Sequence, residues 1–355
     1  MTLRRVQVTD FRCLSPATLE LHPRFSLISG PNASGKTSLL EALYLLGRGR
    51  SFRSRRLDQL IQSGRERFMI VGEVAWGEQR AVLGVEGTAL GLRARVQGER
   101  ASSLAELAAL LPVQIIDPEV HRLIEEGPGR RRRFIDWGVF HVEPSYVAHW
   151  QRYQQVLKQR NAALRAGQPA SVVAAWDPDL LRYGEAVTEA RQRYLARLEP
   201  EAKTLARALL GLDLALSYRP GWPRDQAFHE ALRQGEGSDR DHGFTQSGPH
   251  RAELGLRLEG LPVKDRISRG QQKLLASALL LAQLRLFPTD RPVQPTLLLD
   301  DPAAELDGGR LAMLIEEISR DRAQLVVTTL NPEFAALGQP GLHVRLEGGR
   351  LVGPN

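Results

Sequence analysis

The chain has 355 residues, of which 42% are hydrophobic and 25% are charged. These proportions argue against long disordered segments, and the length allows two domains or one domain with a large insertion. The 48 lysines and arginines outnumber the 41 acidic residues, and the formal charge of +7 favours a polyanionic partner without identifying it. A single cysteine, Cys13, excludes an internal disulfide and a cysteine-based zinc site, and it suits a reducing cytosol.

Short strands are predicted over 3–9, 17–21 and 25–29, where apolar residues alternate with polar ones or run together between turn-prone residues. Because these strands come before the first helix, we expect a sheet in which an antiparallel part joins a parallel part. Further strands are expected over 68–75 and 80–85. The opening residues lack the apolar core of a signal peptide, and the longest apolar run, 274–284, is too short to cross a bilayer. We therefore expect a cytoplasmic protein.

The stretch from Gly30 to Thr37, called the phosphate loop below, fits the pattern G-x-x-x-x-G-K-[ST] at each fixed position. It follows a predicted strand and leads into a helical pattern over 37–46, as this motif requires. Glycine lets backbone N–H groups close around an anion, and the start of the helix favours the same anion. Lys36 is expected to contact the β- and γ-phosphates during catalysis, and Thr37 to ligate Mg²⁺. The expected ATP-binding residues are Gly30, Pro31, Asn32, Ala33, Ser34, Gly35, Lys36 and Thr37.

Two arginine-rich segments are candidates for contact with nucleic-acid phosphates. One follows the first predicted helix, and the other precedes a helix that contains aromatic residues. A merely solvated charged face explains either segment about as well, so both interpretations stay open. The arginines are Arg50, Arg53, Arg55 and Arg56 in the first segment and Arg130, Arg131, Arg132 and Arg133 in the second.

Helical periodicity dominates from about 104 to 239, where strand signals are nearly absent. We interpret this part as a helical insertion lobe of residues 104–239 inside a head made of residues 1–103 and 240–355. The glycine- and aspartate-rich stretch 235–247 is expected to be a flexible crossing back to the head, and a strand is expected over 254–258.

The segment Ser268-Arg269-Gly270-Gln271 precedes an apolar helix over 272–284. Ser268 and Gln271 have the spacing of a capping box, which explains both residues without a ligand. A serine hydroxyl and a glycine at a helix start also suit a second anion site. Spacing alone favours the cap.

An apolar strand over 296–299 ends in two carboxylates, Asp300 and Asp301. At the end of a strand beside a phosphate loop, Asp300 can hold Mg²⁺ and Asp301 can orient or deprotonate the attacking water. An aspartate pair that only forms a turn is the alternative, which the upstream phosphate loop disfavours. A helix over 308–319, a strand over 324–329 and a hairpin over 344–352 complete the prediction.

In this order, the phosphate loop, Ser268 to Gln271, Leu297 to Asp301 and Glu305 to Asp307 resemble the motifs of the ABC-type, SMC-like ATPases of DNA maintenance. The chain is similar to the bacterial recombination mediators over essentially its whole length. The resemblance implies an α/β fold: an ABC-type P-loop ATPase head, whose mixed sheet has an antiparallel N-terminal part, with a compact helical insertion lobe. Further blocks that carry it are Asp10 to Arg12, Gly47 to Arg53, Arg131 to Asp136, Lys158 to Asn161 and Gly248 to His250.

What the resemblance implies for the site is an ATP- and Mg²⁺-dependent homodimer. In it, Arg12 contacts phosphate, Asp301 serves hydrolysis, and Glu305 and Asp307 form an inter-subunit loop. The signature residues of the opposite copy, acting in trans, are Ser268, Arg269, Gly270 and Gln271. The implied metal-site residues are Thr37, Asp300 and a glutamine-loop residue, Gln114.

The resemblance also implies a weak, DNA-stimulated ATPase that binds double-stranded or gapped DNA and acts in DNA damage repair, DNA replication and the SOS response. RecR is the implied protein partner, with RecO engaged indirectly, in assisting recombinase loading. Two alternatives remain: an ATP-binding DNA clamp with negligible turnover, and the nucleotide-binding subunit of a membrane transporter. The long helical insertion argues against the transporter, as does Thr329 where transporter ATPases carry a switch histidine.

Overall fold

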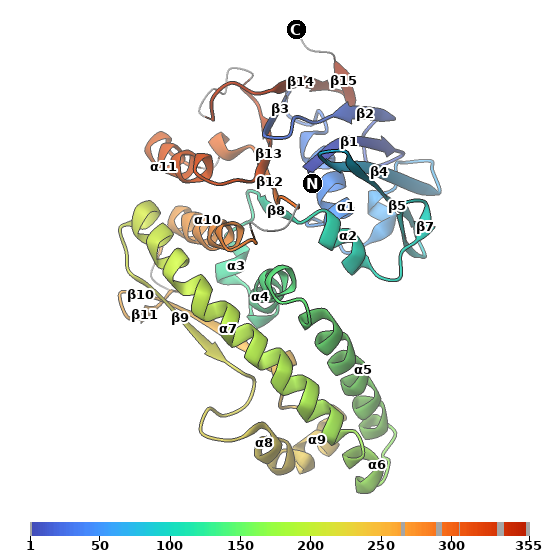
Figure 1. The fold of residues 1–355 in the computed structure, drawn as a ribbon, viewed down its shortest axis with the longest axis vertical. Helices are drawn as coiled ribbons and strands as arrows, with labels where there is room; N and C mark the ends of the chain where they lie inside the picture. The colour runs from blue at the N-terminus through green and yellow to red at the C-terminus, as the bar shows by residue number, and fades with distance from the viewer. Residues whose placement is uncertain (1, 264–266, 289–292, 305, 332–336, 353–355) are drawn as a thin grey trace. The chain divides into compact units, whose positions relative to one another are not determined.

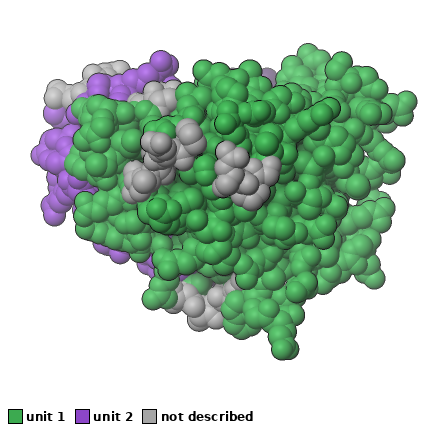
Figure 2. Space-filling view, turned by 90° about the horizontal axis from the view of Figure 1, so that it is seen from above, with its two compact units in different colours: residues 1–120, 288–355 green, residues 121–287 purple. Residues whose placement is uncertain are grey.

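The computed structural model describes residues 2–263, 267–288, 293–304, 306–331 and 337–352. It consists of two compact units, unit 1 made of residues 1–120 and 288–355 and unit 2 made of residues 121–287 (Figure 2). The chain therefore leaves unit 1 once and returns once. In the described part of the chain, no helix is long and apolar enough to cross a membrane.

The N-terminal strands of unit 1 form an antiparallel sheet of their own (Figure 1). Along its two longest strands, buried residues alternate with more exposed ones, because only one face of the sheet packs on the core. The expected antiparallel part therefore exists, but it is not joined to the parallel strands in one sheet. In spatial order its strands are β2 (Ala17–Glu20), β1 (Thr2–Thr9), β4 (Arg67–Trp76), β5 (Gln79–Thr88), β6 (Gly91–Val96) and β7 (Glu99–Arg100).

The second sheet of unit 1 holds the two motif-bearing strands, β3 and β12, and each of these is buried along its whole length. All its strands are parallel except β15, which pairs antiparallel with β14. Such continuous apolar strands are typical of parallel sheets covered on both faces. In spatial order they are β15 (Arg350–Val352), β14 (Leu342–Glu347), β3 (Phe25–Ser29), β13 (Gln324–Thr329), β12 (Thr296–Asp300) and β8 (Val113–Ile116).

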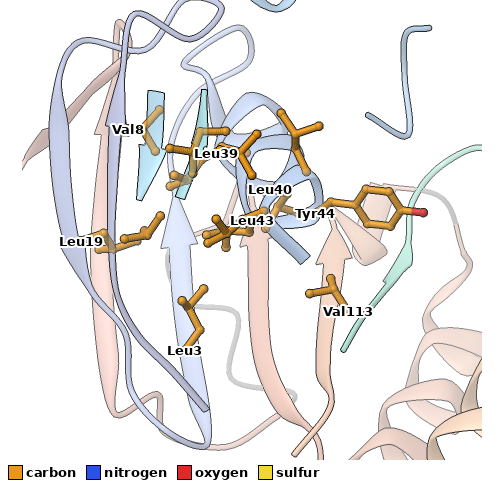
Figure 3. Close-up of a cluster of buried hydrophobic side chains, with 14 of the residues drawn as sticks. Leu3, Val8, Leu19, Leu39, Leu40, Leu43, Tyr44 and Val113 are labelled. Atoms are coloured by element: carbon orange, nitrogen blue, oxygen red, sulfur yellow. The ribbon is translucent and has the colours of Figure 1, made fainter. Parts of the chain in front are cut away.

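The core of unit 1 forms around helix α1 (Lys36–Arg48), which follows β3 directly. Leu39, Leu40 and Leu43 of α1 share one hydrophobic cluster with Leu3 of β1 and Val113 of β8 (Figure 3). Packing that involves both sheets therefore fixes the start of α1. The remaining helical segments of this unit are η1 (Leu57–Leu60), α2 (Leu104–Leu110), η4 (Pro302–Ala304) and α11 (Gly308–Ser319).

Unit 2 is built mainly from helices that pack on the long helix α7 (Asp177–Leu210), with α4, α5 and α10 among them. A small antiparallel sheet, in the order β11-β10-β9, also contacts α7 through β9. The other helical segments are α3 (Arg122–Glu125), α4 (Pro128–Val142), α5 (Tyr146–Arg165), α6 (Ala170–Ala174), α8 (Phe228–Gln234), α9 (Glu236–His242), η2 (Pro249–Arg251) and α10 (Arg269–Arg285). The strands are β9 (Leu214–Arg219), β10 (Glu253–Leu258) and β11 (Leu261–Pro262).

The boundaries between the units differ from those expected at 103/104 and 239/240. Residues 104–120 stay with unit 1 because β8 pairs in parallel with β12. Residues 240–287 stay with unit 2 because β10 pairs with β9 and α10 packs on α7. These pairings join residues far apart in the sequence, so periodicity along the chain could not place the boundaries.

The stretch 235–247 is not the flexible crossing that its composition predicts. Residues 236–242 form helix α9, in which the Asp239 side chain is 1% exposed. The guanidinium of Arg160 donates to Asp239 Oδ2 at 2.7 Å, so a buried ion pair holds this polar segment in place.

Candidate nucleotide-binding site

The phosphate loop connects β3 to α1 and requires glycine at both ends. Gly30 and Gly35 have φ angles of 155° and 104°, in the region that favours glycine. A Cβ on Gly30 would lie 2.2 Å from the carbonyl oxygen of Leu346, so a side chain there would collide with backbone. The first turn of α1 has neither a side-chain cap nor an acidic residue. Its N–H groups therefore remain available to an anionic ligand.

Two polar side chains of the loop are buried around the space that a phosphate would occupy. Lys36 Nζ donates to the carbonyl oxygens of Gly30 and Pro31 at 2.7 and 2.9 Å. Burial lowers the pKa of Lys36, while the charges of Asp301 and Asp300 act in the opposite direction. The Ser34 hydroxyl is buried and has no hydrogen-bond partner among the residues that the structure describes. A buried hydroxyl without a partner is destabilising on its own and points to a ligand that would satisfy it.

Thr37 and Asp300 meet where α1 begins and β12 ends. The Thr37 hydroxyl lies 2.9 Å from Asp300 Oδ2, and the Thr328 hydroxyl donates to Asp300 Oδ1 at 2.8 Å. Among the described residues, no group of three His, Cys, Asp or Glu side chains is placed to hold a metal. One hydroxyl and one carboxylate suit Mg²⁺, which in nucleotide sites takes its other ligands from phosphate oxygens and water.

Asp301 follows directly and adopts a left-handed backbone conformation, with a φ of 47°. Its N–H donates to the backbone oxygen of Thr328 at 3.1 Å, which fixes the turn after β12. Asparagine and aspartate tolerate this conformation better than most residues. The two aspartates are therefore held differently, Asp300 at the end of the strand and Asp301 in the turn beyond it.

Gln114 lies on β8 opposite Leu297, three residues before Asp300 on the paired strand. At about 3.3 Å per residue, this offset places Gln114 about 10 Å along the strands from the level of Asp300. The structure therefore does not bring Gln114 together with Thr37 and Asp300.

Arg12 is held by Glu41 of α1. Its Nε and Nη2 atoms donate to the carboxylate at 2.9 and 2.8 Å. The hydroxyl of Ser51 also contacts Glu41, and Arg53 lies 3.6 Å from it. The phosphate contact that the resemblance implies for Arg12 stays a prediction, because in this structure its guanidinium pairs with Glu41. We did not predict the role of Glu41, although it stands out in the sequence as a single carboxylate inside the apolar pattern of α1.

The second arginine-rich segment is largely engaged within unit 2. Arg131 forms a two-point pair with Glu253 at 2.8 and 3.0 Å, and Arg132 donates to the carbonyl oxygen of Ala252. Arg130 pairs with Glu126 at 2.8 Å. These arginines thus tie α4 to its neighbours, so Arg131 and Arg132 are not part of a merely solvated face, and their contact with DNA stays a prediction.

The first arginine-rich segment is more exposed. Arg50 and Arg55 are exposed, and Arg56 is exposed but pairs with Asp58. Arg53 is also exposed, and its guanidinium lies 3.6 Å from the Glu41 carboxylate. The segment as a whole remains a candidate for contact with phosphates.

The capping box predicted at α10 is confirmed. The N–H of Gln271 donates to the Ser268 hydroxyl at 3.3 Å, and the N–H of Ser268 donates to Gln271 Oε1 at 3.0 Å. Ser268 and Arg269 are exposed, and Gly270 is half-buried, so another molecule can reach this helix start. Asp307 caps α11 by accepting from the N–H of Arg310, whereas Glu305 lies outside the described residues.

Comparison with known families shows a match over residues 2–349 to the family described as RecF/RecN/SMC N terminal domain. The DNA replication and repair protein RecF of Pseudomonas putida (strain W619) is 43% identical over 343 residues, which cover 95% of this chain and 93% of that protein. The protein of the same name from Shewanella loihica (strain ATCC BAA-1088 / PV-4) is 37% identical over 357 residues, or 99% of each chain.

Solved structures agree with this assignment. The recombination mediator protein RecF-ATPrS in the RecFOR pathway superimposes with a TM-score of 0.84 at 26% identity, covering 98% of this chain and 97% of that one. The RecF-ATP structure has a TM-score of 0.86 at 24% identity and covers 100% and 98% of the two chains. An Smc head bound to the C-winged helix domain of ScpA shares the fold, with a TM-score of 0.61 at 15% identity and coverage of 99% and 97%.

Proposed function

Because this chain belongs to the RecF/RecN/SMC family, and its near full-length relatives are RecF proteins, we propose that it is an ATP-dependent DNA-binding protein of recombinational repair. Its fold is that of the ABC-type ATPase heads of this family, with a helical lobe. Binding of ATP is supported by the likeness to the RecF-ATP and RecF-ATPrS structures. Work in the cytoplasm on chromosomal DNA is part of the same proposal.

The observation that carries the proposal is the buried, unpartnered Ser34 hydroxyl inside a phosphate loop whose helix start is uncapped. A triphosphate satisfies this hydroxyl together with the N–H groups of the loop. Lys36 exchanges its two loop carbonyls for phosphate oxygens, which match its positive charge better.

Thr37 and Asp300 would hold Mg²⁺, which neutralises charge on the phosphates when bound. Asp301, fixed in the turn after β12, would orient or deprotonate the attacking water. Arg12 would either keep its ion pair with Glu41 when ATP is bound, or release Glu41 and contact a phosphate of ATP. We assign no metal role to Gln114, because its register places it away from the Thr37–Asp300 pair.

The signature segment suggests how ATP would join two copies. Ser268 caps its own helix and remains exposed, so the same hydroxyl and the nearby N–H groups can meet a γ-phosphate held by another copy. Asp307, with Glu305, would border this contact. A dimer closed by ATP would then bind duplex DNA near single-strand gaps, hydrolyse ATP slowly with stimulation by DNA, and assist recombinase loading with RecR and, through it, RecO.

The test exploits the two roles of Ser268. Ser268→Asp keeps a good N-cap but places a carboxylate where the γ-phosphate would dock. We expect this variant to unfold like the wild type and to bind ATP as a monomer, yet not to dimerise when its mass is measured by light scattering with ATP and Mg²⁺. Ser268→Ala is the matched control, which should lose about 1 kcal/mol of stability because the cap is removed.

A wild-type protein whose mass does not respond to ATP would overturn the proposed dimer. If Ser268→Asp dimerises with wild-type affinity, Ser268 caps its own helix but does not contact the γ-phosphate of the other copy.

A further inference from the structure

Helix α5 (Tyr146–Arg165) presents an exposed face that carries positive charge without any negative charge. None of its 20 residues is Asp or Glu. Three exposed cations, Arg152, Lys158 and Arg165, lie on it, and it runs along the surface of unit 2 beside α7 (Figure 1). The neutral polar residues exposed between them are Gln151, Gln154, Gln155 and Gln159.

The opposite face of α5 is fixed firmly in unit 2. The rings of Tyr146, Trp150 and Tyr153 stack in succession, and Arg191 lies over the Trp150 ring at 5.1 Å from its centre. Arg160, whose side chain is 1% exposed, contacts Asp177 at 2.8 Å. Because its inner face is packed in this way, helix α5 is already ordered, and its exposed face needs no conformational ordering before it binds a partner.

The pairing of cations differs between the two faces. Buried Arg160 has two carboxylate partners, Asp177 and Asp239, at 2.8 and 2.7 Å. Arg152, Lys158 and Arg165 have no carboxylate partner among the described residues. Some exposed arginines elsewhere in unit 2 do have a carboxylate partner, as Arg193 has Glu143, Arg207 has Asp213 and Arg240 has Glu236.

The composition of this face indicates its partner. A protein–protein interface is centred on buried apolar or aromatic anchors, and no large apolar residue of α5 is exposed. Protein–DNA interfaces are polar and positively charged, and they bind phosphates through Arg, Lys and amide side chains. At 1.5 Å per residue, Arg152, Lys158 and Arg165 are spaced by about 9 and about 10 Å along the helix, so together they can reach several phosphates.

We propose that the exposed face of α5 binds the phosphate backbone of duplex DNA. This inference deepens the proposed function, on which it rests, by locating a DNA contact on α5 instead of on Arg130, Arg131 and Arg132. The contact involves phosphates, so it adds affinity without sequence preference.

The experiment compares two triple variants of the full-length protein with equal loss of charge. The first is Arg152→Gln, Lys158→Gln and Arg165→Gln; glutamine retains helix propensity, so α5 should stay folded. The control removes three exposed arginines that already have carboxylate partners, Arg193→Gln, Arg207→Gln and Arg240→Gln. Thermal unfolding of both variants establishes that they are folded.

Binding of a labelled DNA duplex is then measured with ATP and Mg²⁺ over a series of NaCl concentrations. Each lost phosphate contact lowers the slope of log K against log salt by about 0.9, so we expect the α5 variant to be shallower than the wild type by about 2 to 3. We expect the control variant to keep nearly the wild-type slope. Single α5 substitutions should lower the slope by about 1 each.

The outcomes separate this inference from the function beneath it. A wild-type protein that binds no duplex with ATP overturns both. A wild-type protein that binds duplex, together with an α5 variant of unchanged slope, overturns the α5 contact alone. Loss of ATP-driven dimerisation, or loss of binding to an added protein partner with unchanged DNA binding, would instead make α5 a protein-contacting surface and overturn the inference.

Discussion

Arg12 and Glu41 form a two-point ion pair that links the turn after β1 to helix α1, which begins in the phosphate loop. The Glu41 side chain is fully buried, whereas the side chain of Arg12 is 20% exposed. Ser51 and Arg53, from the arginine-rich segment, converge on the same carboxylate. One buried charge thus holds two separate loops against the helix that would bind nucleotide.

Glu41→Gln tests how much this carboxylate contributes to the stability of the protein. Removing one partner of a buried ion pair leaves the other uncompensated, so we expect the free energy of unfolding to fall by about 3 kcal/mol in urea titrations. The control is Arg53→Gln, which removes a half-exposed partner 3.6 Å away and should cost less than about 1 kcal/mol. Equal midpoints for both variants would show that Glu41 is not the organising charge.

Ser34→Ala should have opposite effects on stability and on ATP affinity. Without nucleotide, removing a buried hydroxyl that lacks a partner should leave the protein as stable as before, or more stable by up to about 1 kcal/mol. Affinity for ATP, measured by calorimetry, should fall about tenfold because a hydrogen bond to a charged phosphate is lost. Unchanged affinity would mean that the Ser34 hydroxyl does not meet the ligand.

The two aspartates should separate binding from turnover. Asp300→Asn removes the carboxylate that accepts from Thr37, so we expect Mg²⁺-dependent ATP binding to be lost. Asp301→Asn retains a residue suited to the left-handed turn, so ATP binding should survive while phosphate release falls at least about a hundredfold.

Phosphate release by the wild type is the reference for this comparison. If the wild type itself shows no turnover, the interpretation as an ATP-binding clamp replaces that as a slow ATPase. If Asp301→Asn hydrolyses ATP at the wild-type rate, the role assigned to Asp301 is wrong.

His250 should make unit 2 less stable in acid. Burial lowers its pKa from 6.5 to about 4, and its ring lies between the Tyr153 hydroxyl at 2.6 Å and the carbonyl oxygen of Thr245 at 3.0 Å. Between these two pH values the unfolded chain binds a proton that the folded chain does not. The contribution is therefore complete above pH 6.5 and is lost as the pH falls toward 4, by roughly 3 kcal/mol in total.

The measurement is urea unfolding at intervals across this window, with His250→Gln as the reference. Since glutamine does not titrate, the stability difference between wild type and variant should shrink steadily with falling pH. A difference that stays constant would show that His250 keeps its ordinary pKa in the folded protein.

Local order could be predicted from the sequence wherever neighbours along the chain decide it. The phosphate loop, the strand over 25–29 and the helix after it follow from a run of a few residues whose backbone must turn tightly. The capping box of Ser268 and Gln271 likewise depends only on a spacing of three residues within one helical turn. The fold class and the family resemblance rest on such local motifs taken in order.

Only the tertiary structure decided which charges are structural and which remain free. Arg131 meets Glu253, 122 positions away, and Arg160 meets Asp239, 79 positions away, whereas the cations on the outer face of α5 meet no carboxylate in the part of the chain described. The sequence around these cations does not distinguish those that are paired from those that are not. The partner of each one depends on which distant segments the fold brings within a few ångströms, and spacing along the chain does not specify that distance.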